Sequence, residues 1–401
     1  MTELLAQLKK RPDLQLAVAT IEGFEDSHFE QDGVEYFVLK RSLLRAIQGR
    51  LGSGKAGLPS KAQVLKCAAI VKQWNPDVVH VHGTEAGYGL IKAWKLTDKP
   101  IAVSVQGLMR PCSSKAYGDL LPKDVDRLLS RLTGLGPSCL QSWRSFRERI
   151  PMEESILRSA DIALGRTEWD RAWVWAISPH TSYRFVDDLM RSEFLDAAPW
   201  SPSSCRPHRI LCTTGPQPMK GLHVLLEAIW RLRQVHPDVQ LHVASAGFGP
   251  VSSGYSRCIW RLIRDWGLEK AVTFLGWIDA GRMVEEMRLA HCYVTPSFNE
   301  NGCNALQEAM LVGLPSVSTL VGGMLSVIES ERTGLTFPAG DAALLAWKIR
   351  RIFEDDTLAM TLGTQARLVA RDKHDPERVV AQVLQAYEEL TNATVTESLV
   401  S

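Results

Sequence analysis

The chain alternates between short apolar runs and longer segments in which apolar residues recur every three or four positions. Short runs rich in β-branched residues predict buried strands, and the longer spacing predicts helices that bury one face. The expected strands lie within segments 14–21, 77–90, 100–109, 160–172, 209–215, 239–249, 271–279, 291–296 and 316–321. Regular alternation of strand and helix predicts an α/β fold built on parallel sheets.

Composition divides the chain into two halves. Residues Ala197–His208 are rich in proline and serine, which is typical of a linker. At 401 residues, the chain is long enough for two domains of ordinary size. We expect an N-terminal domain over 1–198 and a second domain over 206–372. A helix over 373–391 is expected to cross back to the first domain, followed by a disordered tail over 392–401.

The most informative stretch runs from the strand His291–Pro296 to the next strand. A polar loop follows the first strand, and apolar spacing predicts a helix from Asn304 that stops at Gly313. Either Asn301 or Asn304 is expected to cap this helix. A strand, a loop and a helix N-terminus together present backbone N–H groups and a positive dipole end to an anion.

Two carboxylates bracket this predicted anion site, Glu300 in the loop and Glu308 within the helix. A carboxylate repels phosphate, but it accepts two hydrogen bonds from vicinal hydroxyls, as Rossmann-type folds do at a ribose. Hydroxyls on either side of a phosphate centre describe a nucleotide sugar. On spacing alone, an amphipathic helix with a solvated glutamate at each end explains the same pattern.

The spacing E-x7-E from Glu300 to Glu308 precedes an A-M-x-x-G-x-P run and a V-G-G turn. This order resembles the signature of the retaining glycosyltransferase family 4. The sequence V-S-V-Q-G-L at Val103–Leu108 is similar to that of family members that make capsular or exopolysaccharides. The resemblance implies a GT-B fold, in which two Rossmann-like domains face one another across a cleft. It also implies transfer of a sugar from a nucleotide diphosphate sugar to an acceptor hydroxyl with retention, without a metal or other cofactor.

Lys220 stands at a helix start after the strand Arg209–Gly215, a position suited to a diphosphate. The resemblance places a donor-phosphate lysine here, in the pair Lys220-Gly221. Family members commonly carry an arginine six residues earlier, where this chain has Thr214.

The remaining donor contacts are implied by the resemblance. Glu300 would hold hydroxyls of the donor sugar, and Glu308 would hold the ribose. The leaving diphosphate would meet the N–H groups of Gly302, Cys303 and Asn304.

The acceptor side is expected at the exits of the strands in the first half. His82 and Glu85 follow the run D-V-V-H-V-H, and side chains at such strand ends face the ligand crevice of α/β folds. His80 shares a face with His82, and a core position explains it equally well. Gln106 stands where many family members have histidine, and it can only hydrogen-bond. Arg166 lies at another strand exit, where a phosphate contact and a salt bridge within the domain remain equal alternatives.

The chain begins with an expected helix, Met1–Lys10, before its first strand. In the family a strand and a glycine-rich loop come earlier, so we expect the N-terminal domain to lack its first strand. Either the recorded start lies downstream of the true one, which we favour, or the domain is incomplete. With Gln106 and Thr214, this feature keeps two alternatives open: a non-catalytic glycosyltransferase-like scaffold or partner subunit, and a nucleotide-sugar epimerase of the same fold.

A formal net charge of +1 gives no general attraction to nucleic acid. The eight cysteines show no C-x-x-C pair, which favours reduced, packed thiols in a cytoplasmic protein over zinc ligands or disulfides. Asp124-Val125-Asp126 spells the D-x-D of metal-binding transferases, but no strand precedes it, so we interpret it as surface charge.

One segment is strongly basic. Residues Phe37–Lys72 contain many lysines and arginines and no acidic residue. A solvated helical face explains this composition, and so does attraction to an anionic membrane or a phosphate-bearing acceptor. G-S-G-K at Gly52–Lys55 lacks the spacing of a P-loop. The expected partners are therefore a nucleotide sugar and a saccharide or lipid-linked saccharide acceptor, with peripheral contact to the cytoplasmic face of a membrane as an option.

Overall fold

The computed structural model describes residues 2–41, 58–126, 138–249 and 254–400. The chain divides into two compact units. Unit 1 comprises Met1–Ser113, Arg144–Leu189 and Asp375–Ser401, and unit 2 comprises Ser114–Trp143 and Met190–His374. Both units contain parallel sheets with helices, as the alternation of apolar patterns predicted.

Unit 2 is built on a six-stranded sheet in the order β10-β9-β8-β11-β12-β13, and all its pairings are parallel. The strands are β8 (Arg209–Thr213), β9 (Gln240–Ala244), β10 (Val272–Gly276), β11 (Cys292–Thr295), β12 (Ser316–Thr319) and β13 (Leu335–Phe337). From β8 the chain first builds outward through β9 and β10 and then returns to add β11 on the other side. This is the strand order of the Rossmann fold, which binds ligands where the direction reverses, between β8 and β11.

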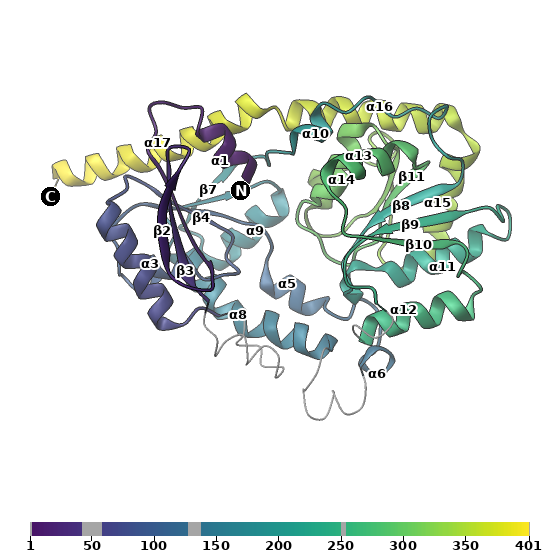
Figure 1. Ribbon diagram of the computed structural model, residues 1–401, viewed down its shortest axis with the longest axis horizontal. Helices are drawn as coiled ribbons and strands as arrows, with labels where there is room; N and C mark the ends of the chain where they lie inside the picture. Colours follow the sequence, from purple (N-terminus) through teal and green to yellow (C-terminus); the bar gives the residue numbers. More distant parts are fainter. Residues whose placement is uncertain (1, 42–57, 127–137, 250–253, 401) are drawn as a thin grey trace. The chain divides into compact units, whose positions relative to one another are not determined.

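Helices cover both faces of this sheet (Figure 1), with α11 and α12 on one side and α13 and α14 on the other. The helical elements of unit 2 are α6 (Pro122–Val125), α10 (Ser192–Leu195), η2 (Pro218–Lys220), α11 (Leu222–Leu232), α12 (Gly254–Asp265), α13 (Ala280–Leu289), α14 (Asn304–Val312), η3 (Gly322–Ser326), α15 (Ala342–Glu354) and α16 (Asp356–Lys373). Strands β8, β11 and β12 are buried along nearly their whole length, because helices pack on both faces.

Unit 1 contains two sheets. A four-stranded parallel sheet has the order β4-β5-β6-β7, and a three-stranded sheet has the order β1-β3-β2, in which β2 and β3 are antiparallel. The strands are β1 (Leu16–Gly23), β2 (Ser27–Gln31), β3 (Val34–Lys40), β4 (Val79–His82), β5 (Ile101–Ser104), β6 (Ile162–Gly165) and β7 (Ser182–Phe185).

The helices of unit 1 include one that returns from the C-terminal end of the chain. They are α1 (Thr2–Leu8), α3 (Lys61–Trp74), α4 (Leu90–Ala93), α5 (Met109–Ser114), α8 (Cys139–Ser159), α9 (Glu168–Ile177) and α17 (Pro376–Val400). The start of α8, residues 139–143, belongs to unit 2. Tyr387 of α17 places its hydroxyl 2.7 Å from Nδ1 of His80, whose Nε2 lies 2.7 Å from the Ser104 hydroxyl. His80 is therefore fully engaged within unit 1, which favours the core alternative for this residue.

Several segments differ from the sequence expectations. Residues 114–126 and 138–143 precede the expected boundary, yet they belong to unit 2. The tail expected to be disordered from residue 392 continues α17 to Val400. Asp126 of the D-x-D is buried, which corrects its assignment as surface charge. The middle of the basic segment, residues 42–57 with Gly52–Lys55, lies outside the described residues; its ends belong to β3 and α3.

The cysteines match the expectation of packed thiols, since all eight are free and five of them are buried. Within the described part of the chain, no helix is both long and apolar enough to cross a bilayer.

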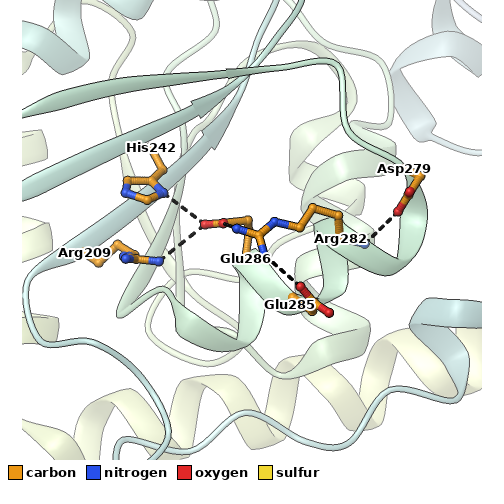
Figure 2. A network of polar contacts seen from close by, with 6 residues as sticks. All are labelled: Arg209, His242, Asp279, Arg282, Glu285 and Glu286. Carbon is orange, nitrogen blue, oxygen red and sulfur yellow. Dashed lines mark hydrogen bonds and ion pairs between the residues drawn. The ribbon is translucent and has the colours of Figure 1, made fainter.

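A buried carboxylate fastens α13 to the sheet of unit 2. Glu286 is 1% exposed and accepts hydrogen bonds from three side chains (Figure 2). The distances from its oxygens are 3.0 Å to Nδ1 of His242 on β9 and 3.4 Å to Nη1 of Arg209 on β8. Arg282, one turn earlier on α13, lies 2.5 Å away. The carboxylate therefore joins a helix to two neighbouring strands.

We expect Glu286→Gln to lower the free energy of unfolding by about 3 kcal/mol, because it leaves the buried Arg209 without its anion. The measurement is urea unfolding followed by circular dichroism. Glu285→Gln is the matched control, since Glu285 pairs with the same Arg282 at 2.8 Å but is exposed. Equal losses in the two variants would contradict the assignment.

A second buried carboxylate, Glu153 on α8, ties together two loops of unit 1. It accepts hydrogen bonds from the Thr84 hydroxyl at 2.9 Å and from the Met109 N–H at 2.9 Å. Thr84 follows β4 and Met109 follows β5, so one side chain fixes both strand exits. Burial raises the pKa of Glu153 from its ordinary value of 4.5 to about 7, although the two hydrogen bonds lower it.

We expect the stability of the wild type to fall as the pH rises from about 4.5 to about 7, because the folded protein holds a proton that the unfolded chain has released. In Glu153→Gln the side chain at position 153 is neutral at every pH. The free energy of unfolding of this variant should therefore rise relative to that of the wild type by up to roughly 3 kcal/mol on going to pH 8. Urea midpoints measured between pH 4.5 and 8 test this. Glu154→Gln is the control, because hydrogen bonding to Arg110 lowers the pKa of Glu154 and reverses the sign. A difference between wild type and Glu153→Gln that is independent of pH would refute the expectation.

Candidate functional site

Two loops of unit 2 meet at the point where the strand order reverses. The first runs from Thr214 to Gly221, includes η2 and leads from β8 to α11. The second runs from Pro296 to Cys303 after β11 and leads to α14. Since β8 and β11 are parallel neighbours, both loops leave the same edge of the sheet. We call them the first and second donor loops.

The backbones of the two donor loops are in direct contact. The Phe298 N–H donates to the Met219 carbonyl oxygen at 2.7 Å. Gly221 has a φ of +72°, and a side chain there would collide with the carbonyl oxygen of Pro296. Only glycine meets both conditions, which gives the Lys220-Gly221 pair a structural reason.

An ion pair closes the junction between the loops. The Lys220 ammonium lies 2.7 Å from Oε1 of Glu300. The Ser297 hydroxyl donates to the same carboxylate oxygen at 2.8 Å. Both ionic side chains are only partly buried, with 29% of Lys220 and 13% of Glu300 exposed. The sequence placed these two residues in one site, and the structure brings them together.

The N-terminus of α14 opens beside this pair. Its N-cap residue is Cys303, whose own side chain makes no capping hydrogen bond. Neither Asn301 nor Asn304 therefore occupies the N-cap position, which corrects the expectation, because Asn304 is already the first helical residue. The Cys303 carbonyl accepts from the N–H groups of Leu306 and Gln307 at 3.1 Å. Gly302, Cys303 and Asn304 thus form the entrance to a helix whose positive end faces the second donor loop.

Glu308 lies one turn further along α14 and is 7% exposed. Its Oε1 accepts from Nε of Arg191 at 3.0 Å and from Nη2 of Arg191 at 2.7 Å. Burial raises the pKa of Glu308, while the hydrogen bonds from Arg191 lower it. Arg191 is the N-cap residue of α10, just before the linker. No periodic pattern marks this position, so nothing in the sequence pointed to Arg191 as the partner of Glu308.

Thr214 begins the first donor loop, and its hydroxyl donates to the Gly215 carbonyl at 3.4 Å. It supplies no positive charge where the family pattern has arginine. Of the lysine and the arginine that the family pattern has in this loop, this chain therefore carries only the lysine, Lys220.

In unit 1, three of the predicted residues lie together at the exits of β4, β5 and β6. Arg166 donates from Nη2 to Oε1 of Gln106 at 3.2 Å. It also forms an ion pair with Asp188, which favours the salt-bridge alternative for Arg166. The carboxylate of Glu85 approaches Gln106 across Gly83. Strand exits thus collect polar side chains here, as in unit 2.

Glu85 lies in a mixed electrostatic environment. Burial raises its pKa, while hydrogen bonds from the backbone and the charges of Arg149 and Arg166 lower it. Arg149 lies on α8, and its buried Nε has no hydrogen-bond partner among the described residues. Arg149 was not singled out from the sequence, because arginines recur throughout that helical segment.

His82 is the last residue of β4, and its ring lies 3.9 Å from the ring of His80. Burial lowers the pKa of His82 to about 4, so the ring is neutral near pH 7. A neutral imidazole can accept one hydrogen bond and donate another. The predicted residues therefore form two groups. Those predicted to bind the sugar donor lie in unit 2, and the imidazole, carboxyl and amide side chains of His82, Glu85 and Gln106 lie in unit 1.

Part of the chain matches a known family. Residues 208–369 match the model described as Glycosyl transferases group 1. Over 176 residues the chain is 29% identical to the D-inositol 3-phosphate glycosyltransferase of Corynebacterium urealyticum, a match that covers 43% of this chain and 41% of that relative. The chain thus spans about two fifths of that relative's length.

Solved structures resemble the chain over nearly its whole length. Sucrose-phosphate synthase from Thermosynechococcus elongatus has a TM-score of 0.75 and 20% identity, covering 98% of this chain and 92% of that one. HepE from Anabaena, in complex with UDP and glucose, has a TM-score of 0.68 and 17% identity, covering 96% and 95%. At such identities the likeness is one of fold. The chain therefore has the GT-B fold of two Rossmann-like domains, and residues 208–369 are a match to the group 1 glycosyl transferases.

Proposed function

We propose that the protein transfers a sugar from a nucleotide diphosphate sugar to an acceptor hydroxyl. The observation that carries this proposal is the Lys220–Glu300 pair, 2.7 Å apart, with Glu300 in the loop that leads to the N-terminus of α14. A cation and the positive end of a helix bind a diphosphate, and a neighbouring carboxylate binds sugar hydroxyls. The similarity of residues 208–369 to group 1 glycosyl transferases supports the same reading.

Lys220 and the N-terminus of α14 would act on the leaving group. As the glycosidic bond breaks, negative charge grows on the diphosphate, and fixed positive groups stabilise that charge without reorganising. In the free protein Glu300 neutralises Lys220. A bound diphosphate would compete for Lys220, which would release Glu300 towards the donor sugar. Glu308 would accept from the ribose with the oxygen that Arg191 leaves unoccupied.

The residues of unit 1 would meet the acceptor. His82 is neutral near pH 7 because its pKa is lowered to about 4, so it is suited to hydrogen bonding. Glu85 and Gln106 would orient an acceptor hydroxyl, with Arg149 beside them. We further propose that transfer retains the anomeric configuration and that the diphosphate guides the attack on the same face. It would need neither a metal nor another cofactor, and it would serve cell-surface polysaccharide synthesis in the cytoplasm, with anionic membrane as a peripheral contact.

Purified full-length protein should bind UDP or GDP and hydrolyse the matching sugar donor slowly. We expect Lys220→Ala to lower the hydrolysis rate by about 10²–10³, as removal of one charge-stabilising group does. Lys348→Ala is the matched control, because Lys348 forms an ion pair of similar length with Glu331 on another part of unit 2, at 2.8 Å. Calorimetric titration and donor hydrolysis are the measurements. If the wild type binds no nucleotide, the enzyme hypothesis is excluded and the non-catalytic scaffold remains. Release of an epimerised sugar would indicate the epimerase.

Arg191 provides a separate test of the role of Glu308. We expect Arg191→Ala to raise the pKa of Glu308, because the lost hydrogen bonds favour its charged form. As the pH falls from 8 to 6, the nucleotide Kd of the variant should then rise by a factor about ten times larger than the factor for the wild type. The reason is that a protonated Glu308 accepts poorly from the ribose. Arg191→Lys keeps a cation and should behave like the wild type. The same pH dependence in all three proteins would argue against ribose binding by Glu308.

A further inference from the structure

We propose that residues 114–126, here called the strap, hold the donor loops in their binding conformation, with Asp119 as a positioning residue for Lys220. The proposal rests on the proposed function and adds a structural element to its donor site. The strap comes from the first half of the sequence, far from the donor loops along the chain. It nevertheless belongs to unit 2.

The strap is firmly anchored at its far end. Asp126 is 4% exposed and accepts from the Tyr117 hydroxyl at 2.8 Å, the Cys139 N–H at 2.8 Å and the Leu140 N–H at 3.1 Å. Val125 is buried in the core of unit 2, and its carbonyl oxygen lies against Gly254 at the start of α12. Burial of a carboxylate is unfavourable unless hydrogen bonds compensate it, and here three donors hold Asp126 in place.

Near its middle, the strap contacts both donor loops. Gly118 has a φ of +61°, and a side chain there would lie 2.9 Å from the Pro218 carbonyl oxygen and 3.1 Å from the Phe298 ring. Pro218 begins η2, which ends at Lys220. Phe298 lies two residues before Glu300 in the second donor loop. One glycine therefore allows the strap to approach the flanks of both charged residues.

Asp119 makes the polar contact that fixes this arrangement. Its Oδ1 lies 2.7 Å from Nε2 of His223, and Nδ1 of the same ring lies 2.8 Å from the Tyr255 hydroxyl. His223 is the second residue of α11, three positions after Lys220, and it is 7% exposed. Its ring stacks on Phe298 at 5.7 Å with an interplanar angle of 3°.

These contacts form a continuous path from the strap to the cation. Asp119 orients His223, and His223 holds both the start of α11 and the ring of Phe298. Lys220 and Glu300 lie on the two segments that are held in this way. Asp119 has no need to touch the donor, because its effect passes through the position of the loops. Hydrogen bonding from His223 lowers the pKa of Asp119, which keeps its carboxyl charged near pH 7.

The test is nucleotide affinity, measured by calorimetry with UDP and GDP on the full-length protein. We expect Kd to rise about tenfold in Asp119→Ala and by a smaller factor in Asp119→Asn, because the amide oxygen can still accept from His223. Asp238→Ala is the matched control. It removes a histidine–carboxylate contact of 2.9 Å with His208, which precedes β8 and so lies at the opposite end of the sheet from the donor loops. The control should change Kd less than twofold.

Amide hydrogen exchange gives a second readout that does not depend on a ligand. In Asp119→Ala, exchange should quicken in residues 216–223 and 296–300 and stay unchanged in β9 and β10, whereas a general loss of stability would quicken it everywhere. If the alanine variant fails to fold, the asparagine variant carries both measurements. Wild-type affinity and unchanged loop exchange in the Asp119 variants would overturn the role of the strap. A wild type that binds neither nucleotide would overturn the proposed function, while the exchange result would still decide whether the strap positions the loops.

Discussion

The proposed donor site of unit 2 depends on a contact between two loops that leave neighbouring strands of one parallel sheet. Lys220 and Glu300 are 80 positions apart in the chain, and the strand order brings them within 2.7 Å of each other. Three features set that distance: the parallel register of β8 and β11, the backbone bond from Phe298 to Met219, and a glycine at 221. A side chain at position 221 would force the loops apart and separate the two charges.

Buried carboxylates serve three different purposes in this protein. Glu286 is compensated by three cationic or imidazole donors and joins a helix to strands. Glu153 has only a hydroxyl and a backbone N–H, so burial dominates and its pKa is raised to about 7. Glu308 pairs with Arg191 through one of its oxygens. The number of cations around each carboxylate thus differs with whether it stabilises the fold, fixes loops or, as proposed, meets a ligand.

Sequence patterns predicted the α/β class, the strands of unit 2 and the meeting of Lys220 with Glu300, because these follow from local periodicity and from turn residues at strand ends. They did not predict Arg191, Arg149 or Asp119. These residues contact segments that are distant in the chain, and such contacts leave no periodic pattern in the sequence. The cap of α14 was misjudged for a local reason: an asparagine near a predicted helix start is a good cap, but here the helix begins at that asparagine and the preceding cysteine takes the cap position.

The chain passes between the two units at residues 113–114, 143–144, 189–190 and 374–375. None of these four crossings falls in the proline-rich segment Ala197–His208, which lies within unit 2 and so corrects the expected boundary, and neither unit is a continuous piece of sequence. A chimera that joined the first half of this protein to the second half of a relative at the linker would pair the strap of one parent with the donor loops of the other. Modular exchange of nucleotide preference in this fold would then require the strap to move together with the second half.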